Sequence, residues 1–121
     1  MPLKQVLVIE DNPMICELLV AILQDQYQVI TASEGEAGLA QALRDAPDLI
    51  LCDVLMPGLH GQQVAARLQE NPATAKIPFV LMSGHGDFQQ SQTAPGLFLQ
   101  KPFAPDEVLR VIDRAFGSGQ G

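Results

Sequence analysis

Five short apolar runs are spaced along the chain, separated by segments with helical periodicity or turn residues. The runs lie at residues 5–9, 27–31, 48–53, 79–82 and 97–100. They are rich in aliphatic residues and nearly continuous in apolar character, which is typical of strands buried on both faces of a sheet. The pattern therefore predicts five strands.

Helix signals follow most of these runs. Asn12 and Pro13 indicate a helix start, because asparagine caps free backbone amides and proline fits the first helical turn. Ser33 and Glu36 have the spacing of a capping box. The expected inner faces are Ile15, Leu18, Leu19, Ile22 and Leu23 in the first helix; Ala37, Ala40 and Leu43 in the second; Val64, Ala65 and Leu68 in the third; and Val108, Leu109, Ile112, Ala115 and Phe116 in the last.

Residues 88–96, between the last two predicted strands, carry a weaker helix signal. This segment offers one large apolar residue, Phe88, and a proline, Pro95. A fourth helix here is expected to be short or irregular, because a short helix persists only when one face is packed. Strands that alternate with helices form right-handed crossovers and a parallel sheet covered on both faces. The predicted fold is thus α/β, a three-layer, doubly wound sheet of five parallel strands.

Composition narrows the class of protein. A chain of 121 residues with 47% hydrophobic residues fits one domain with one core, which we assign to residues 1–116, with 117–121 as a flexible tail or linker start. No apolar run is long enough for a membrane span, and no secretory signal is evident. The net charge of −7 argues against direct nucleic-acid binding. Cys16 and Cys52 lack metal or redox spacing, which favours reduced thiols in a cytoplasmic protein.

Polar residues end four of the five predicted strands. They are Glu10 with Asp11, then Asp53, Ser83 and Lys101. Ligands bind beyond the carboxyl ends of strands in such sheets. Three carboxylates at one edge repel each other, and a hard divalent cation such as Mg²⁺ would offset that repulsion. Because a hydroxyl and an ammonium beside such a site can bind phosphoryl oxygens, the joint placement favours phosphoryl chemistry at Asp53.

Four motifs stand in order along the chain, at residues 8–12, 53–58 with Gly61, 83–87 and 101–103. Together they resemble the receiver domain of response regulators in two-component signalling, over nearly the whole chain. The resemblance implies a flavodoxin-like fold with strand order 2-1-3-4-5.

The resemblance also implies a chemical role for the motif residues around Asp53. Asp53 would be the phospho-acceptor, taking the phosphoryl group from a partner's phosphohistidine. Its carboxylate would share a Mg²⁺ (or Mn²⁺) ion with Glu10, Asp11 and the backbone carbonyl of Leu55.

Ser83 and Lys101 would bind phosphoryl oxygens, and a cis bond between Lys101 and Pro102 would aim the lysine inward. Phe98 occupies the family's switch-aromatic position and would turn inward as Ser83 moves, a two-state change biased by local charge. The implied partners are a histidine kinase or a histidine phosphotransfer protein, and a downstream output protein or domain, with a homodimer as a further option.

The chain departs from the family's pattern at two places. Lys101 follows Ser83 by 18 positions, fewer than is usual, so we expect a remodelled output surface around the fourth helix, fifth strand and last helix. Leu55 and His85 flank the site where the family sets the rate of dephosphorylation. Leu55 cannot orient an attacking water by hydrogen bonding, and His85 either does so or is simply exposed.

Other functions would need different residues around the same site. A Mg²⁺-dependent aspartyl-phosphate phosphohydrolase would want a second acid two residues after Asp53, where Leu55 stands. A pseudo-receiver would bind partners without phosphorylation, and the intact set of acids argues against it. Flavin binding would need a phosphate-cradling loop after the first strand, where Glu10 and Asp11 repel phosphate. The sequence therefore favours a phospho-accepting signalling domain rather than an enzyme with an external substrate, either stand-alone or from a longer protein such as a hybrid histidine kinase.

Overall fold

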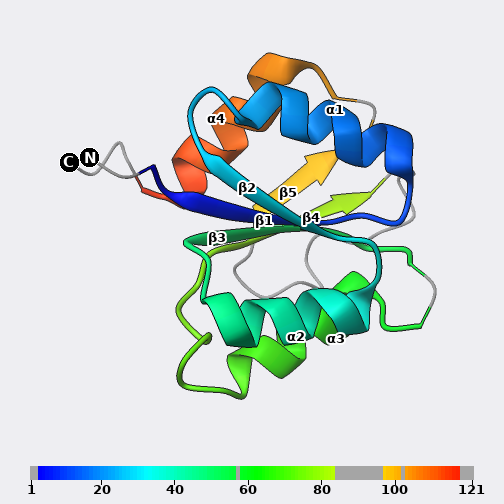
Figure 1. The fold of residues 1–121 in the computed structure, drawn as a ribbon, viewed down its shortest axis with the longest axis vertical. Helices are drawn as coiled ribbons and strands as arrows, with labels where there is room; N and C mark the ends of the chain where they lie inside the picture. Colours follow the sequence, from blue (N-terminus) through cyan, green and yellow to red (C-terminus); the bar gives the residue numbers. More distant parts are fainter. Residues whose placement is uncertain (1–2, 57, 84–96, 102, 118–121) are drawn as a thin grey trace.

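A five-stranded parallel sheet lies between two pairs of helices in the computed structural model, which describes residues 3–56, 58–83, 97–101 and 103–117 (Figure 1). The elements are β1 (Gln5–Ile9), α1 (Pro13–Leu23), β2 (Gln28–Ala32), α2 (Gly35–Asp45), β3 (Leu49–Asp53), α3 (Gly61–Gln69), β4 (Phe79–Ser83), β5 (Leu97–Gln100) and α4 (Pro105–Ala115). Helices α1 and α4 cover one face of the sheet, and α2 and α3 cover the other. The predicted three-layer α/β fold is confirmed.

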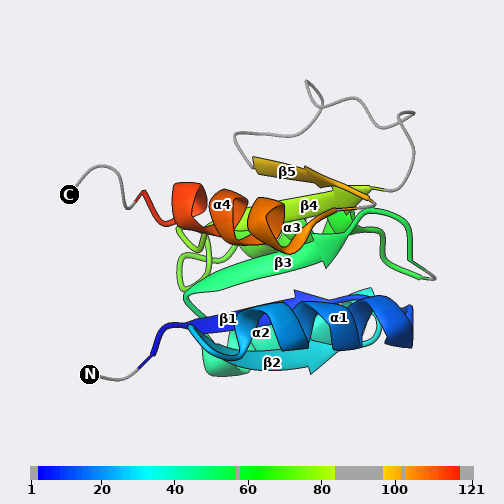
Figure 2. The ribbon, with the colours of Figure 1, turned by 90° about the horizontal axis from the view of Figure 1, so that it is seen from above.

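The strand order is β2-β1-β3-β4-β5, with every neighbouring pair parallel, as the resemblance implied. Figure 2 shows the strands side by side, all running in the same direction. The chain passes from β1 to β2 on one side and then returns to β3 on the other side of β1. The topological switch point therefore lies between the carboxyl ends of β1 and β3, which is where open α/β sheets bind ligands.

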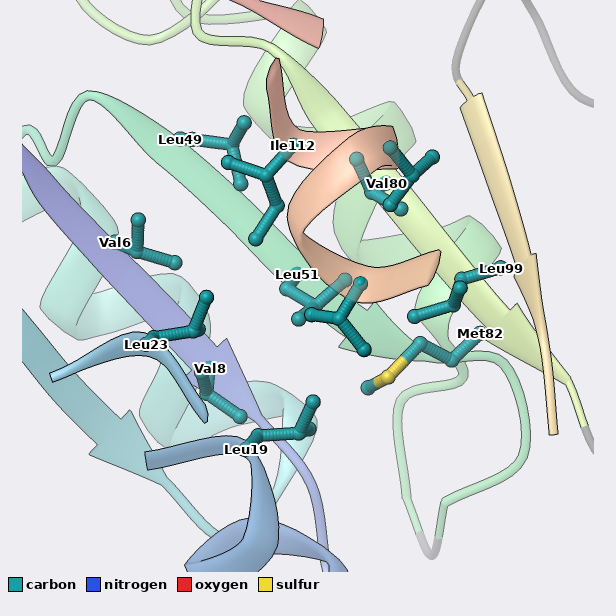
Figure 3. Close-up of a cluster of buried hydrophobic side chains, with 12 residues drawn as sticks. Val6, Val8, Leu19, Leu23, Leu49, Leu51, Val80, Met82, Leu99 and Ile112 are labelled. Carbon is teal, nitrogen blue, oxygen red and sulfur yellow. The ribbon is translucent and has the colours of Figure 1, made fainter. Parts of the chain in front are cut away.

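Alternate residues of the inner strands contribute to two hydrophobic clusters, one on each face of the sheet. Val6 and Val8 of β1, with Leu51 of β3, pack against α1 and α4 (Figure 3). Leu7 and Ile9, between them in sequence, belong to the core beneath α2 and α3. Because successive strand residues point to opposite faces and both faces are covered, the inner strands β1, β3 and β4 are apolar over most of their length.

Substitution of a core leucine is expected to cost far more stability than substitution of a surface leucine. Leu51 is 0% exposed, so Leu51→Ala should lower the free energy of unfolding by about 2–5 kcal/mol, through lost burial and the cavity left behind. Leu43 is 44% exposed, and Leu43→Ala should change it by less than about 0.5 kcal/mol. Urea unfolding of both variants measures the difference, and equal losses would contradict this assignment of the core.

The inner face of α2 differs from the predicted one. Ala37, Ala40 and Leu43 were expected to face the sheet but are exposed, and the buried positions are Gly35 and Gly38, with Ala42 and the half-buried Leu39. A β-carbon at Gly35 would lie 2.5 Å from the backbone oxygen of Leu59, so the helix can pack this closely only because glycine stands there. The prediction was wrong because hydrophobic periodicity gives no weight to a glycine, which makes this contact by having no side chain.

Two smaller expectations about the helices also fail. Ser33 does not cap α2, because the N-cap position is occupied by Glu34, without a side-chain hydrogen bond. Leu18 of α1 is exposed, and the buried residues of that helix are Leu19 and Leu23. The inner faces predicted for α3 and α4 are confirmed, and Val111 joins the buried side of α4.

Several predictions lie outside the described residues. They are the short or irregular helix between β4 and β5, His85, the cis bond to Pro102 and the end of the tail at 118–121.

Candidate functional site

The carboxyl ends of β1 and β3 bring two acids together. Ile9 pairs with Cys52 across these strands, so Glu10 and Asp53 follow at the same edge of the sheet. The Glu10 amide donates to the Ala32 carbonyl at 3.0 Å, which continues the ladder with β2. Both acidic residues are nearly buried, with 2% of Glu10 and 6% of Asp53 exposed. Pairing within the sheet thus fixes the backbones of Glu10 and Asp53. Because their carboxylates are buried from water, they need partners within the protein.

The start of α1 orients the Glu10 carboxylate. Asn12 is the N-cap, and its side-chain oxygen accepts from the amides of Met14 and Ile15 at 2.9 and 3.2 Å. The Asn12 amide in turn donates to Oε2 of Glu10 at 3.2 Å. Asp11, between them, is exposed. The sequence correctly predicted Asn12 as a helix cap, but the contact of its backbone amide with Glu10 was missed. The spacing of two residues between the glutamate and the asparagine was the signal that could have indicated this contact.

Lys101 lies between the two buried acids. Its Nζ donates to Oδ2 of Asp53 at 3.1 Å and lies 3.0 Å from Oε1 of Glu10. Its backbone amide donates to the Ser83 carbonyl at 2.7 Å, which ties the residue after β5 to the end of β4. The structure therefore brings Glu10, Asp53 and Lys101 into direct contact.

The electrostatics of these groups are dominated by burial. Burial raises the pKa of Glu10 to about 7, and the negative charge of Asp53 adds to this effect, while the Lys101 ammonium and the Asn12 amide oppose it. Burial lowers the pKa of Lys101, but its contacts with Glu10 and Asp53 outweigh that effect and leave the pKa raised above its usual value. Lys101 is therefore a protonated ammonium at neutral pH, facing acids that lack a second cation among the described residues.

Three carboxylates at this edge lie close enough together to hold a cation. Glu10, Asp11 and Asp53 each present an oxygen, and these three atoms lie within 4.8 Å of one another. Carboxylate oxygens are the ligands that Mg²⁺ prefers, and a site with few protein ligands leaves room for the waters that Mg²⁺ retains. The donor set thus fits the predicted metal. Leu55 lies two residues after Asp53 with its side chain 56% exposed, and its role as a backbone ligand stays a prediction.

The remaining predicted residues lie on β4 and β5. Ser83 is buried at the end of β4, opposite Gln100 of β5 in the sheet register. Phe98 is half-buried within β5 and pairs with Leu81. Both residues make further contacts, and their roles in a switch stay predictions.

The raised pKa of Glu10 is expected to make the stability of the protein depend on pH in metal-free buffer. A pKa of about 7 in the folded state, against 4.5 for an ordinary glutamate, means that the folded state binds the proton more tightly. The stability that proton binding to Glu10 contributes is fully present below the pKa of glutamate in the unfolded state. It is lost as the pH rises through the higher pKa of Glu10 in the folded state. The free energy of unfolding should therefore fall by at most about 3 kcal/mol across that window.

Urea unfolding in EDTA on the acidic and the alkaline side of this window measures the fall. Glu10→Gln should lack this component, and Glu17→Gln, an exposed control on α1, should keep it. Identical pH profiles for wild type and Glu10→Gln would contradict the assignment.

Comparison with known proteins decides the family. Residues 6–113 match the sequence profile of the response regulator receiver domain. The chain belongs to this family. Receiver domains act between histidine kinases and output domains in two-component systems. Among the described residues of this receiver domain, no helix is long and apolar enough to cross a membrane.

The curated relatives of this receiver domain differ in total length. Response regulator PleD of Caulobacter vibrioides is 41% identical over 110 residues, a match that covers 87% of this chain and 24% of PleD. Hybrid signal transduction histidine kinase D of Dictyostelium discoideum is 31% identical over 89% of this chain and 7% of the kinase. Protein PilH of Pseudomonas aeruginosa is 33% identical over 92% of this chain and 96% of PilH. The receiver domain thus spans only a minor part of PleD and the kinase, but nearly all of PilH.

Solved receiver structures share the fold. Chemotaxis protein CheY4 of Vibrio cholerae superimposes with a TM-score of 0.87 at 26% identity, covering 93% of this chain and 98% of that one. The receiver domain of sensor histidine kinase PA1611 from Pseudomonas aeruginosa PAO1 gives a TM-score of 0.88 at 24% identity, covering 95% and 98%. That structure holds a magnesium ion coordinated in its active site cleft.

Proposed function

We propose that this receiver domain accepts a phosphoryl group on Asp53 from the phosphohistidine of a partner protein. The observation that carries the proposal is the position of the Lys101 ammonium, 3.1 Å from Oδ2 of Asp53, beside three carboxylates that converge on one edge of the sheet. A carboxylate that is already ionised needs no general base to attack the phosphorus of a phosphoramidate. It does need counter-charge for the phosphoryl oxygens, and this arrangement supplies it.

An oxygen of the Asp53 carboxylate attacks phosphorus, and an O–P bond forms. The P–N bond to the partner's imidazole breaks with its electron pair on nitrogen, and because the other ring nitrogen carries a proton, the leaving group is the neutral imidazole. Lys101 offsets the negative charge of one phosphoryl oxygen, and the Ser83 hydroxyl donates to another. The near-complete burial of Asp53 keeps bulk water from surrounding these charges, which strengthens each contact.

Glu10, Asp11, Asp53 and the Leu55 carbonyl would hold Mg²⁺ or Mn²⁺. The bound cation supplies charge neutralisation during transfer. Without it, three carboxylates would face a phosphoryl group that carries further negative charge, and one ammonium cannot offset all of them. The carboxylate cluster and the family are the support for this part of the proposal.

The domain would modify only itself, and on this proposal it is not an enzyme with an external substrate. Its partners would be a histidine kinase or a histidine phosphotransfer protein and a downstream output protein or domain, in the cytoplasm. Its signal would leave through a surface that includes β5 and α4. The relatives place the same domain both in hybrid kinases and in regulators, so both arrangements remain part of the proposal.

Intact-mass spectrometry tests the proposal. The chain is incubated with Mg²⁺ and a small acyl phosphate, with an EDTA control. An acid-stable, base-labile phosphoryl adduct that requires the metal supports the proposal. No adduct, under conditions that label a control receiver domain, would instead favour a pseudo-receiver. Continuous phosphate release at enzyme-like rates would favour a phosphohydrolase, a function against which the exposed Leu55 argues because it offers no second acid beside Asp53.

A further inference from the structure

Strand β2 forms an open edge of the sheet. It stands last in the strand order, at the opposite rim from β5 (Figure 2), and no described strand pairs with its outer side. The Gln28 amide donates to the Lys4 carbonyl at 2.9 Å, so the backbone groups of Gln28 point toward β1. Because this direction alternates along a strand, the amides and carbonyls of Val29 and Thr31 point outward, where a further strand could meet them.

The sequence of β2 lacks the features that usually protect such an edge. Natural edge strands are blunted by charged residues, prolines or bulges. The β2 sequence, Gln-Val-Ile-Thr-Ala, contains no charged residue and no proline, and its pairing with β1 is regular over all five residues. A regular, uncharged edge of this kind is a template for another strand in the same sheet.

A hollow beside this edge offers room for the side chains of an added strand. It has a volume of about 350 Å³ and lies beside α1 and β2. Its lining consists of Cys16, Glu17, Val20, Ala21, Gln24 and Thr31. Val20 and Ala21 give it an apolar wall, and Glu17 is its single charged residue. Outward backbone groups and a partly apolar hollow thus lie together along β2.

Two copies of β2 satisfy each other's outer edge in an antiparallel pair centred on Ile30. In that register Val29 lies opposite the partner's Thr31, and Thr31 lies opposite the partner's Val29. Because both are outward residues, each of these pairs exchanges two backbone hydrogen bonds. Ile30 meets its own copy at the two-fold axis, as a self-complementary interface requires.

The charges around β2 permit this register. The chain carries a net charge of −7, so contact between two copies is opposed wherever acids face each other. Residues 26–33 carry no charge, and the flanking acids Asp25 and Glu34 fall opposite uncharged residues of the other copy. Helix α1 runs in opposite directions in the two copies, which places the two Glu17 carboxylates toward opposite ends of the contact. No like charges therefore meet directly across the paired strands.

We propose that two copies of this receiver domain associate through their β2 edges, so that one sheet continues across both copies. This inference goes beyond the proposed function. Asp53 ends β3, two strands in from this edge, and β5 lies at the far rim. The contact therefore leaves the acidic edge and the surface of β5 and α4 open in both copies, and association requires neither metal nor phosphorylation.

Sedimentation equilibrium tests the association. The average mass of the wild type should rise with concentration from 13.0 kDa toward twice that value. Thr31→Pro removes an outward amide that the pairing with β1 does not use, so the variant should fold and stay at the monomer mass. Thr31→Val keeps the amide and should associate like wild type. A wild type that stays monomeric at every concentration, or a Thr31→Pro variant that still dimerises, overturns the proposal.

Disulfide trapping tests the register and does not depend on a disruptive variant. In a Cys16→Ser background the remaining native thiol, Cys52, is 0% exposed. Ile30→Cys would lie beside its own copy, where the α-carbons of such a pair are about 4.5 Å apart and within reach of a disulfide. Gln28→Cys lies on the same strand but opposite the partner's Ala32, so its own copy is about 13 Å away along the strand.

Mild oxidation should therefore convert Ile30→Cys to a covalent dimer and leave Gln28→Cys monomeric. Random collision would give the reverse order, because Gln28 is exposed and Ile30 is half-buried. Equal rates of dimer formation, faster trapping of Gln28→Cys, or no covalent dimer of Ile30→Cys overturns the proposed pairing.

Discussion

Replacement of Asp53 by asparagine is expected to abolish the phosphoryl adduct completely. The amide has nearly the shape of the carboxylate, so the sheet edge should keep its geometry, but its oxygen is a far weaker nucleophile. The change also removes the negative charge of one of the three carboxylates that could share a cation, and one of the two ion-pair partners of Lys101. Intact mass after incubation with an acyl phosphate and Mg²⁺ measures the loss, and urea unfolding shows that the variant folds.

Two matched variants define what the loss means. Asp25→Asn changes an exposed aspartate that follows α1 and should label like wild type. Asp11→Asn weakens the metal cluster without touching the nucleophile, so its labelling should fall and then recover at higher Mg²⁺ concentration. An adduct in Asp53→Asn at the wild-type level would place the modification on another residue and would contradict the role of Asp53.

The strand ends were the most predictable part of the site. A strand buried on both faces is apolar along its length, so a polar residue after it marks the edge of the sheet. Glu10 and Asp53 stand out in this way, and parallel pairing of β1 with β3 makes them neighbours. Strand identity and strand order therefore carried most of the information about which groups meet.

Contacts that depend on side-chain reach were not predictable in the same way. Lys101 was expected to meet a phosphoryl group, but the sequence does not show that its ammonium lies as close to Glu10 as to Asp53. The inner face of α2 was missed for a related reason, because Gly35 and Gly38 contribute by having no side chain. Hydrophobic periodicity cannot detect a contact made by the backbone.

Gly61 shows how such a backbone contact supports the site. It is the first residue of α3, and its amide donates to the Val54 carbonyl at 3.0 Å. A β-carbon there would lie 2.4 Å from the backbone oxygen of Asp53 and 2.8 Å from Cδ2 of Leu81. The leucine methyl can shift, but the Asp53 carbonyl belongs to the end of β3. Glycine at this position therefore lets α3 begin directly against the end of β3, at Asp53.

Gly61→Ala is consequently expected to lower the free energy of unfolding by about 3 kcal/mol and to weaken Mg²⁺ binding, because the added methyl group displaces the backbone of Asp53. Urea unfolding and calorimetry measure the two effects. Gln62→Ala, at the next and exposed position of α3, should change neither. Gly58→Ala tests a different cause, since Gly58 has φ of 78° with nothing within 4 Å of a β-carbon, and it should cost about 1 kcal/mol through backbone strain alone. A small loss of stability and an unchanged metal affinity in Gly61→Ala, as expected for Gly58→Ala, would contradict this prediction. That result would show that close packing of α3 does not hold Asp53 in place.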